Sequence, residues 1–128
     1  MAYRVAGVKV QRDNYIFHII KADDWKEFQN KEFYFPKSFT EDGFIHCSTA
    51  NQIEGVANSN FKGITDLQLL VIDKNKVKAE IRYEGVYEGY FYPHIYGHLE
   101  VYAVVKVEEL KPGHSGVFNI EEILKTHC

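Results

Sequence analysis

The stretch DLQLLVID (residues 66–73) decides the fold class of this chain. Its apolar residues run on without alternation, which is typical of a strand that is buried on both faces. The stretch NYIFHII (14–20) is equally apolar and rich in β-branched and aromatic residues, so it predicts a second buried strand. The core is therefore expected to contain a sheet.

Shorter elements are predicted around these two strands. Helices are expected over KADDWKEFQNKEF (21–33) and STANQIEGVANSNF (48–61). Their expected N-caps are Asp23 or Asp24 for the first and Ser48 or Thr49 for the second. The remaining chain predicts a loop at 34–43, strands at 44–47, within 74–85, within 86–97 and at 98–110, and a terminal amphipathic helix at 116–127. Segregated elements of this kind indicate an α+β fold, with two or three short helices and a largely antiparallel sheet, in a single domain over residues 1–128.

The composition argues against several classes of protein. The formal net charge is −3 and the Lys and Arg residues are scattered, which disfavours binding to a nucleic-acid backbone. No apolar run approaches the ~20 residues that span a bilayer, and the N-terminal MAYRVAGVKVQRDN lacks the apolar run of a secretory signal. Two cysteines so far apart do not form a disulfide framework, so a reducing, cytoplasmic location is expected.

Three histidines, His18, His46 and His94, lie at the ends of predicted strands, where sheet folds build sites. Ser48 follows His46 by two residues and Tyr96 follows His94 by two, so each pair projects from one face of its strand. Such convergent polar groups indicate a cleft for an anionic or hydroxyl-rich ligand. The alternatives are that each imidazole is a core residue with one hydrogen bond to the backbone, and that Ser48 only caps a helix.

Other side chains are candidates for the same cleft. Arg82 suits a phosphate group, and Glu84 or Glu100 can act as general acid or base if either enters the cleft. Metal binding by the histidines with Cys47 is disfavoured, because structural zinc ligands usually come in close pairs along the sequence. Cys47 and His46 point to opposite faces of one strand, so they do not form a catalytic dyad, and Cys47 is expected to be a core residue.

Several strings in the chain, taken together, resemble the domain of unknown function 952 family. They are FHI (17–19), ADDW (22–25), GFIHCST (43–49), LLVID (69–73) and PHIYGHL (93–99). The resemblance covers about residues 15–107, and FIHCS followed by PHIYG is its most specific part. The family is uncharacterised, so the resemblance implies relatives without an activity. Its fold is similar to that of the ADP-ribosyltransferases, which implies a split antiparallel sheet around a cleft for nicotinamide adenine dinucleotide (NAD).

The likeness to ADP-ribosyltransferases implies roles for individual residues. In those enzymes a histidine on the first core strand contacts a ribose of NAD, and His18 matches it. The motif that supports the nicotinamide side is matched by His46 with Ser48. The catalytic glutamate is matched by the region of His94, where this chain has no glutamate. The tRNA 2′-phosphotransferases of the same fold lack that glutamate but use several arginines, of which only Arg82 lies in the matched region.

Three functions follow as hypotheses. The first is an ADP-ribosyltransferase-like enzyme that binds NAD or a related nucleotide, with a histidine as general acid or base. The second is a catalytically inactive module that binds a nucleotide or a phosphorylated small molecule. The third is a metal-dependent enzyme with histidine ligands. The expected catalytic residues are His94 and His46, and the expected ligand-binding residues are His18, His46, Ser48, Tyr96 and Arg82.

Overall fold

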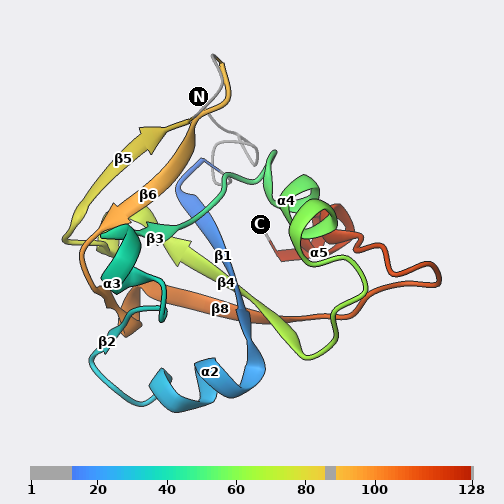
Figure 1. Cartoon of the computed structure of the whole chain (residues 1–128), viewed down its shortest axis with the longest axis horizontal. Helices are drawn as coiled ribbons and strands as arrows, with labels where there is room; N and C mark the ends of the chain where they lie inside the picture. The colour runs from blue at the N-terminus through green and yellow to red at the C-terminus, as the bar shows by residue number, and fades with distance from the viewer. Residues whose placement is uncertain (1–12, 86–88, 128) are drawn as a thin grey trace.

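The computed structural model describes residues 13–85 and 89–127 (Figure 1). The two long apolar runs form neighbouring antiparallel strands, β1 (Tyr15–Lys21) and β4 (Leu67–Asp73), which pair along their whole length. Strand β8 (Val104–Leu110) lies on the other side of β4, so the first sheet has the order β1-β4-β8. The α+β class and the antiparallel pairing predicted from the sequence are therefore confirmed.

Strands β1 and β4 are buried on both faces, which explains why their apolar residues do not alternate with polar ones. Phe17 and Ile19 of β1 point to one side, where they join a core with helices α4 (Ile53–Asn60) and α5 (Ile120–His127). Ile16 and Ile20 point to the other side and join a second core, which includes Trp25 and Tyr34. His18 lies between Ile16 and Ile20 on this second side, because alternate residues of a strand share a face.

A second antiparallel sheet stands beside the first. It has the order β3-β6-β5 and consists of β3 (Ile45–His46), β6 (Tyr92–Tyr96) and β5 (Glu80–Glu84). Ile45 pairs with Ile95, and Ile95 pairs with Ile81, so these apolar side chains share one face. That face packs into the second core, and the residues that alternate with them are left on the opposite face.

The two sheets are joined by one isolated bridge between Phe17 and Ser48, whose main-chain N–H groups each donate to the other's carbonyl at 2.8 Å. In a continuous antiparallel ladder the next pair to exchange bonds would be Ile19 and His46. The strands diverge there instead, and Nδ1 of His18 lies 2.6 Å from the carbonyl oxygen of His46. The sheet is split at this point, with a side chain occupying the place of a main-chain bond.

Four α-helices are present in the described part of the chain, one more than the upper limit predicted. Besides α4 and α5 they are α2 (Ala22–Phe28) and the short α3 (Phe39–Asp42), which lies in the segment predicted as a loop. The N-cap of α2 is Lys21, so the prediction of Asp23 or Asp24 is wrong. These two carboxylates lie in the first turn, where they favour the positive end of the helix dipole.

Helix α4 begins later than predicted. Its N-cap is Gln52 rather than Ser48 or Thr49, because Ser48 is held in the bridge to β1. The turn from Thr49 to Gln52 leads into the helix, and the main-chain N–H of Thr49 donates to Oε1 of Gln52 at 3.0 Å. Nε2 of Gln52 donates in turn to the carbonyl oxygen of Phe91 at 2.7 Å. Gln52 thus links the start of α4 to the end of the β5–β6 connection.

The single strand predicted over 98–110 is wrong, because this segment serves two sheets. Its first part is β7 (Leu99–Glu100), which pairs with β2 (Phe33–Tyr34) in a two-stranded sheet. A 3₁₀ turn, η2 (Val101–Ala103), follows, and the chain then enters β8 beside β4. Within residues 13–85 and 89–127, no helix has the length and apolarity that crossing a bilayer requires.

Replacing Gln52 with alanine should lower the free energy of unfolding by about 1–2 kcal/mol. The variant loses both side-chain hydrogen bonds to main-chain groups, and each such bond contributes about 1 kcal/mol. Urea unfolding followed by circular dichroism measures the change. The matched control is Gln29→Ala, at an exposed position just after α2, which should change the stability by less than about 0.5 kcal/mol. Equal effects of the two substitutions would contradict this account of the α4 start.

Candidate functional site

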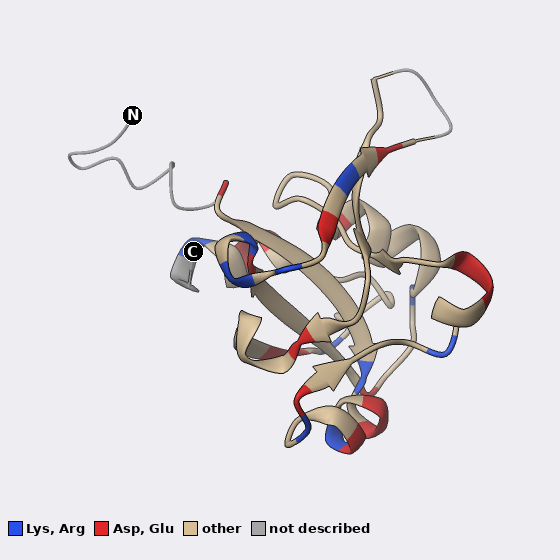
Figure 2. Cartoon of the chain, turned by 90° about the vertical axis from the view of Figure 1, so that its left-hand side faces the viewer, with Lys and Arg blue, Asp and Glu red and all other residues tan. Residues whose placement is uncertain are grey.

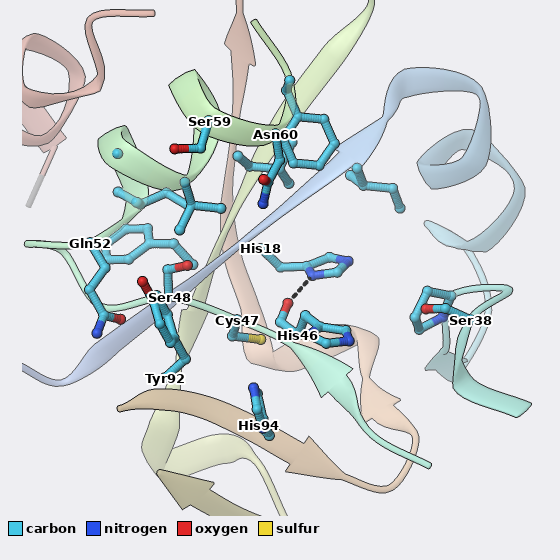
Figure 3. Close-up of a pocket in the computed structure, with 18 of the residues that line it drawn as sticks. His18, Ser38, His46, Cys47, Ser48, Gln52, Ser59, Asn60, Tyr92 and His94 are labelled. Atoms are coloured by element: carbon cyan, nitrogen blue, oxygen red, sulfur yellow. Dashed lines mark hydrogen bonds between the residues drawn. The ribbon is translucent and has the colours of Figure 1, made fainter. Parts of the chain in front are cut away.

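A cleft of about 1110 Å³ opens where the two sheets diverge (Figure 3). Strand β1 and helix α4 lie on one side of it, and β3 and β6 lie on the other. Four of the predicted site residues line it, namely His18, His46, Ser48 and His94. Tyr96 and Arg82 are not among its lining residues, but Tyr96 bonds to Glu84, which holds His94, and Arg82 lies over the Tyr96 ring.

The strand register places the polar residues of the second sheet in rows. His46 of β3 is the partner of His94 in β6, and His94 is the partner of Arg82 in β5. Residues paired across antiparallel strands share a face, so these three side chains form one row on the face opposite the isoleucines. The imidazole rings of His46 and His94 are 5.3 Å apart, edge to face. The register of β3 on β6 therefore brings this pair of histidines side by side.

His94 is held on two sides. The ring of Phe44 is stacked on its imidazole, with centroids 4.1 Å apart and planes inclined by 19°. Nδ1 of His94 lies 2.9 Å from Oε1 of Glu84, and the His94 side chain is only 14% exposed. A carboxylate oxygen accepts and does not donate, so Nδ1 carries the proton of this bond. In the neutral ring the lone pair is then on Nε2.

Glu84 is shared by two donors on β6. The hydroxyl of Tyr96 donates to the same Oε1 atom at 2.6 Å. Hydrogen bonds from Tyr96 and then from His94 hold the pKa of Glu84 below its usual value, and the same carboxylate raises the pKa of Tyr96. The guanidinium of Arg82 lies 4.3 Å above the Tyr96 ring and pairs with Glu80 at 3.1 Å. Tyr96 therefore links Glu84, the partner of His94, to Arg82 at the end of the row.

The second carboxylate considered from the sequence, Glu100, lies elsewhere. It is buried at the end of β7, where Oε1 accepts a hydrogen bond from the main-chain N–H of Lys78 at 3.3 Å. It does not line the cleft. Glu84 is therefore the carboxylate that accompanies His94, and the sequence named it without being able to place it.

His46 has a carboxylate partner of its own. Its Nε2 lies 2.9 Å from Oδ2 of Asp42, and its side chain is 58% exposed. Asp42 ends α3, and Gly43 follows it in the left-handed conformation with φ 79°, which turns the chain directly into β3. Asp42 was not predicted as a site residue. The signal available was the pair of acidic residues, Glu41 and Asp42, just before the Gly43 that precedes the strand of His46.

His18 is enclosed at the wall of the cleft. Its Nδ1–H donates to the carbonyl oxygen of His46 at 2.6 Å, because that oxygen can only accept. Its Nε2 accepts from the hydroxyl of Tyr34 at 2.8 Å. Burial lowers the pKa of His18 to about 4, so the ring is neutral at physiological pH. Both nitrogens are engaged within the protein, and the predicted contact of His18 with a ligand stays a prediction.

Cys47 is buried beside this site, with 4% of its surface exposed. Burial raises the pKa of its thiol well above the usual value, so it stays protonated and is a weak nucleophile. Within the described residues, no group of three or more His, Cys, Asp or Glu side chains is arranged to hold a metal ion.

Helix α4 and the turn before it contribute a polar wall that the sequence analysis did not assign. Asn51, Gln52, Ser59 and Asn60 line the cleft, and Figure 3 shows Ser59 and Asn60 on the helix side, across β1 from His94. Of the described residues that line the cleft, two carry a Lys, Arg, Asp or Glu side chain, and these are Lys21 and Asp24. In the ribbon of Figure 2, the Lys and Arg positions of the described residues are interspersed with Asp and Glu positions and form no continuous basic stripe.

Comparisons with known proteins agree with this architecture. The family model described as "Protein of unknown function (DUF952)" matches residues 19–107. The crystal structure of protein CC0527 from Caulobacter crescentus is similar, with a TM-score of 0.79, 25% sequence identity, and coverage of 87% of this chain and 98% of that chain. The solution NMR structure of CC0527 gives a TM-score of 0.72 at 24% identity and covers 89% and 99%. No curated protein matches the chain in sequence.

Proposed function

The chain belongs to the DUF952 family of proteins of unknown function, and we propose that its cleft binds a nucleotide of the NAD type as part of an ADP-ribosyltransferase-like enzyme. The observation that carries the proposal is the row of imidazoles at the split between two antiparallel sheets. His46 and His94 stand there side by side, and a carboxylate backs each of them. Imidazoles titrate near neutral pH and suit the transfer of protons to and from ribose hydroxyls or water.

The size and walls of the cleft support an extended ligand. Pockets for small molecules usually enclose about 300–1,000 Å³, so about 1110 Å³ is enough for a molecule with two ring systems. The polar wall on α4 offers amide and hydroxyl groups, and the half-buried Phe61 beside it offers an aromatic surface. Arg82, half exposed at the end of the histidine row, is expected to meet a phosphate group of the ligand.

The open strand edge supports the nicotinamide part of the proposal. The N–H of Phe17 points toward β3, so the main-chain groups of Ile19 and Lys21 also point away from β4 and toward the cleft. Both residues line the cleft. A strand edge offers an N–H and a C=O side by side, which is the complement of a carboxamide such as that of nicotinamide. We therefore also propose that the split sheet is of the ADP-ribosyltransferase type.

Calorimetric titration with NAD, ADP-ribose and nicotinamide tests the binding. We expect NAD to bind, and His46→Ala to weaken its affinity about tenfold, since loss of one charge-assisted or strong hydrogen bond costs about 1.4 kcal/mol. His114→Ala is the matched control, because His114 is exposed in the loop after β8 and outside the cleft, and it should leave the affinity unchanged. Absence of heat from all three ligands at millimolar concentration would overturn the proposal.

A second function is favoured by one specific observation. Among the described residues, no carboxylate lines the cleft beside His94, because Glu84 bonds to Nδ1 of the ring from outside the cleft. A module that binds the nucleotide without reacting with it is therefore the alternative. Incubation with NAD separates the two, because only the enzyme releases nicotinamide, and His94→Ala should abolish that release while the fold stays intact.

A further inference from the structure

We infer that Glu84 is the positioning residue of this site, and that it fixes His94 as a general base toward a hydroxyl nucleophile. This inference rests on the proposed function, since it specifies the chemistry that a bound NAD-type ligand undergoes. It departs from the ADP-ribosyltransferases, in which the glutamate is itself the catalytic residue. The carboxylate here acts through an imidazole instead.

The geometry fixes which nitrogen of His94 is available. Glu84 accepts the Nδ1 proton at 2.9 Å, so the lone pair of the neutral ring is on Nε2. Phe44 stacks on the ring at 4.1 Å and opposes rotation about its side-chain bonds. Figure 3 shows the His94 ring projecting from β6 toward Cys47 and His46. Nε2 is therefore the atom of this pair that can accept a proton from a ligand in the cleft.

Glu84 is suited to stabilise the charge that proton transfer creates. The hydroxyl of Tyr96 donates to the same oxygen at 2.6 Å, and these hydrogen bonds keep the carboxylate ionised. An ionised carboxylate beside Nδ1–H holds the tautomer and favours the imidazolium that forms when Nε2 takes a proton. The hydrogen bond from Tyr96 thus holds the Glu84 carboxylate in place, and the carboxylate holds the orientation and tautomer of the His94 ring.

The step that follows can be written in full. A hydroxyl oxygen, of water or of an acceptor, forms a bond to C1′ of the nicotinamide ribose. The bond from C1′ to the pyridinium nitrogen breaks, and its electron pair neutralises the ring, which leaves as nicotinamide. The hydroxyl proton moves to Nε2 of His94, and the imidazolium is stabilised by Glu84 until solvent removes the proton. The predicted reaction class is therefore transfer of ADP-ribose to a hydroxyl or to water.

Long-range ¹H–¹⁵N NMR spectra of the imidazole rings test the positioning directly. In the wild-type chain with the ring neutral, Nδ1 of His94 should show the shift of a protonated nitrogen and Nε2 that of an unprotonated one. Glu84→Ala removes the acceptor and should shift the Nε2 signal toward the protonated position. Glu84→Gln keeps an oxygen that can accept from Nδ1 and should preserve the tautomer. Glu109→Ala, an exposed carboxylate on β8 outside the cleft, is the matched control.

Kinetics of nicotinamide release from NAD test the chemical role. We expect Glu84→Ala to lower kcat about 100-fold with KM changed less than about threefold, because proton transfer to a positioned base contributes about that much. Glu84→Gln should retain the tautomer of His94 but still lower kcat. This result would separate the effect of the negative charge of Glu84 from the effect of its hydrogen bond to Nδ1. Glu109→Ala should match the wild type.

Each outcome decides one of the two proposals. A wild-type His94 with a protonated Nε2, or a Glu84→Ala variant with unchanged ¹⁵N shifts and unchanged kcat, overturns the role of Glu84. Binding of NAD without release of nicotinamide overturns the general-base step and favours the binding module. Failure of NAD to bind overturns the proposed function and this step with it, while the NMR spectra still decide whether Glu84 sets the tautomer. Glu84 is partly exposed at the end of β5, so its variants are expected to fold.

Discussion

When the pH falls from 7 to 4, the titration of His18 alone should lower the free energy of unfolding by about 3 kcal/mol. Its pKa is about 4 in the folded chain and 6.5 in the unfolded reference, a difference worth about 1.4 kcal/mol for each pH unit. Between these two values the unfolded chain binds the proton and the folded chain does not. The contribution of His18 to the stability is therefore fully present above about pH 6.5 and is lost as the pH falls toward 4. The physical cause is burial, with both ring nitrogens already bonded in the neutral form.

Urea unfolding of wild type and His18→Asn at several pH values between 4 and 7 measures this contribution. The asparagine amide can still donate to the carbonyl of His46, but the buried hydroxyl of Tyr34 loses its acceptor, which costs about 1–3 kcal/mol at pH 7. The variant cannot take up a proton, so its deficit should shrink or reverse at pH 4. His114→Asn, in an exposed loop, should follow the wild-type profile. A constant difference between wild type and His18→Asn across the range would contradict the buried neutral ring.

Replacing Ile95 with alanine should destabilise the chain by about 2–5 kcal/mol, the range for removing a fully buried aliphatic side chain. Ile95 is 0% exposed and pairs with Ile45 and Ile81 on the core face of the second sheet. His94 and Tyr96 flank this residue on the opposite face of the same strand, so a shift of the strand is expected to displace them as well. The core beneath the site and the site itself therefore depend on one another.

Denaturant unfolding of Ile95→Ala, beside Ile64→Ala as the matched control, tests this. Ile64 is 37% exposed and lies in the connection before β4, so its loss should cost less than about 1 kcal/mol. In the Ile95 variant, NMR signals of the His46 and His94 rings should also move, since their strands repack. A small loss of stability with unmoved ring signals would show that the second sheet does not rely on this core.

The long strands could be predicted from the sequence because burial on both faces leaves a direct mark on composition. The two apolar runs match β1 and β4 to within one or two residues. The prediction that Ser48 shares a face with His46, and Tyr96 with His94, followed from the alternation of side chains along a strand. The division of 98–110 between β7 and β8 could not be predicted, because no Gly or Pro marks the turn and only the two different partner strands separate them.

The hydrogen-bond partners of the histidines could not be predicted from the sequence, for a related reason. His18 meets Tyr34 and the carbonyl of His46, which are 16 and 28 residues away along the chain. Local patterns specify that a side chain is polar within an apolar run, but the partner that satisfies it is chosen by the packing of separate elements. Glu84 was recognised as a candidate, whereas its selection over Glu100 required the register of β5 on β6.

The single bridge between Phe17 and Ser48 has a consequence for how the family's members can differ. Each sheet completes its own hydrogen-bond ladder, whereas the apolar faces of both sheets meet in one shared core that includes Ile16, Ile20, Ile45 and Ile95. Substitutions on the cleft side of the bridge can therefore change the room for a ligand without breaking either ladder. Substitutions in the shared core instead alter the packing of both sheets at once.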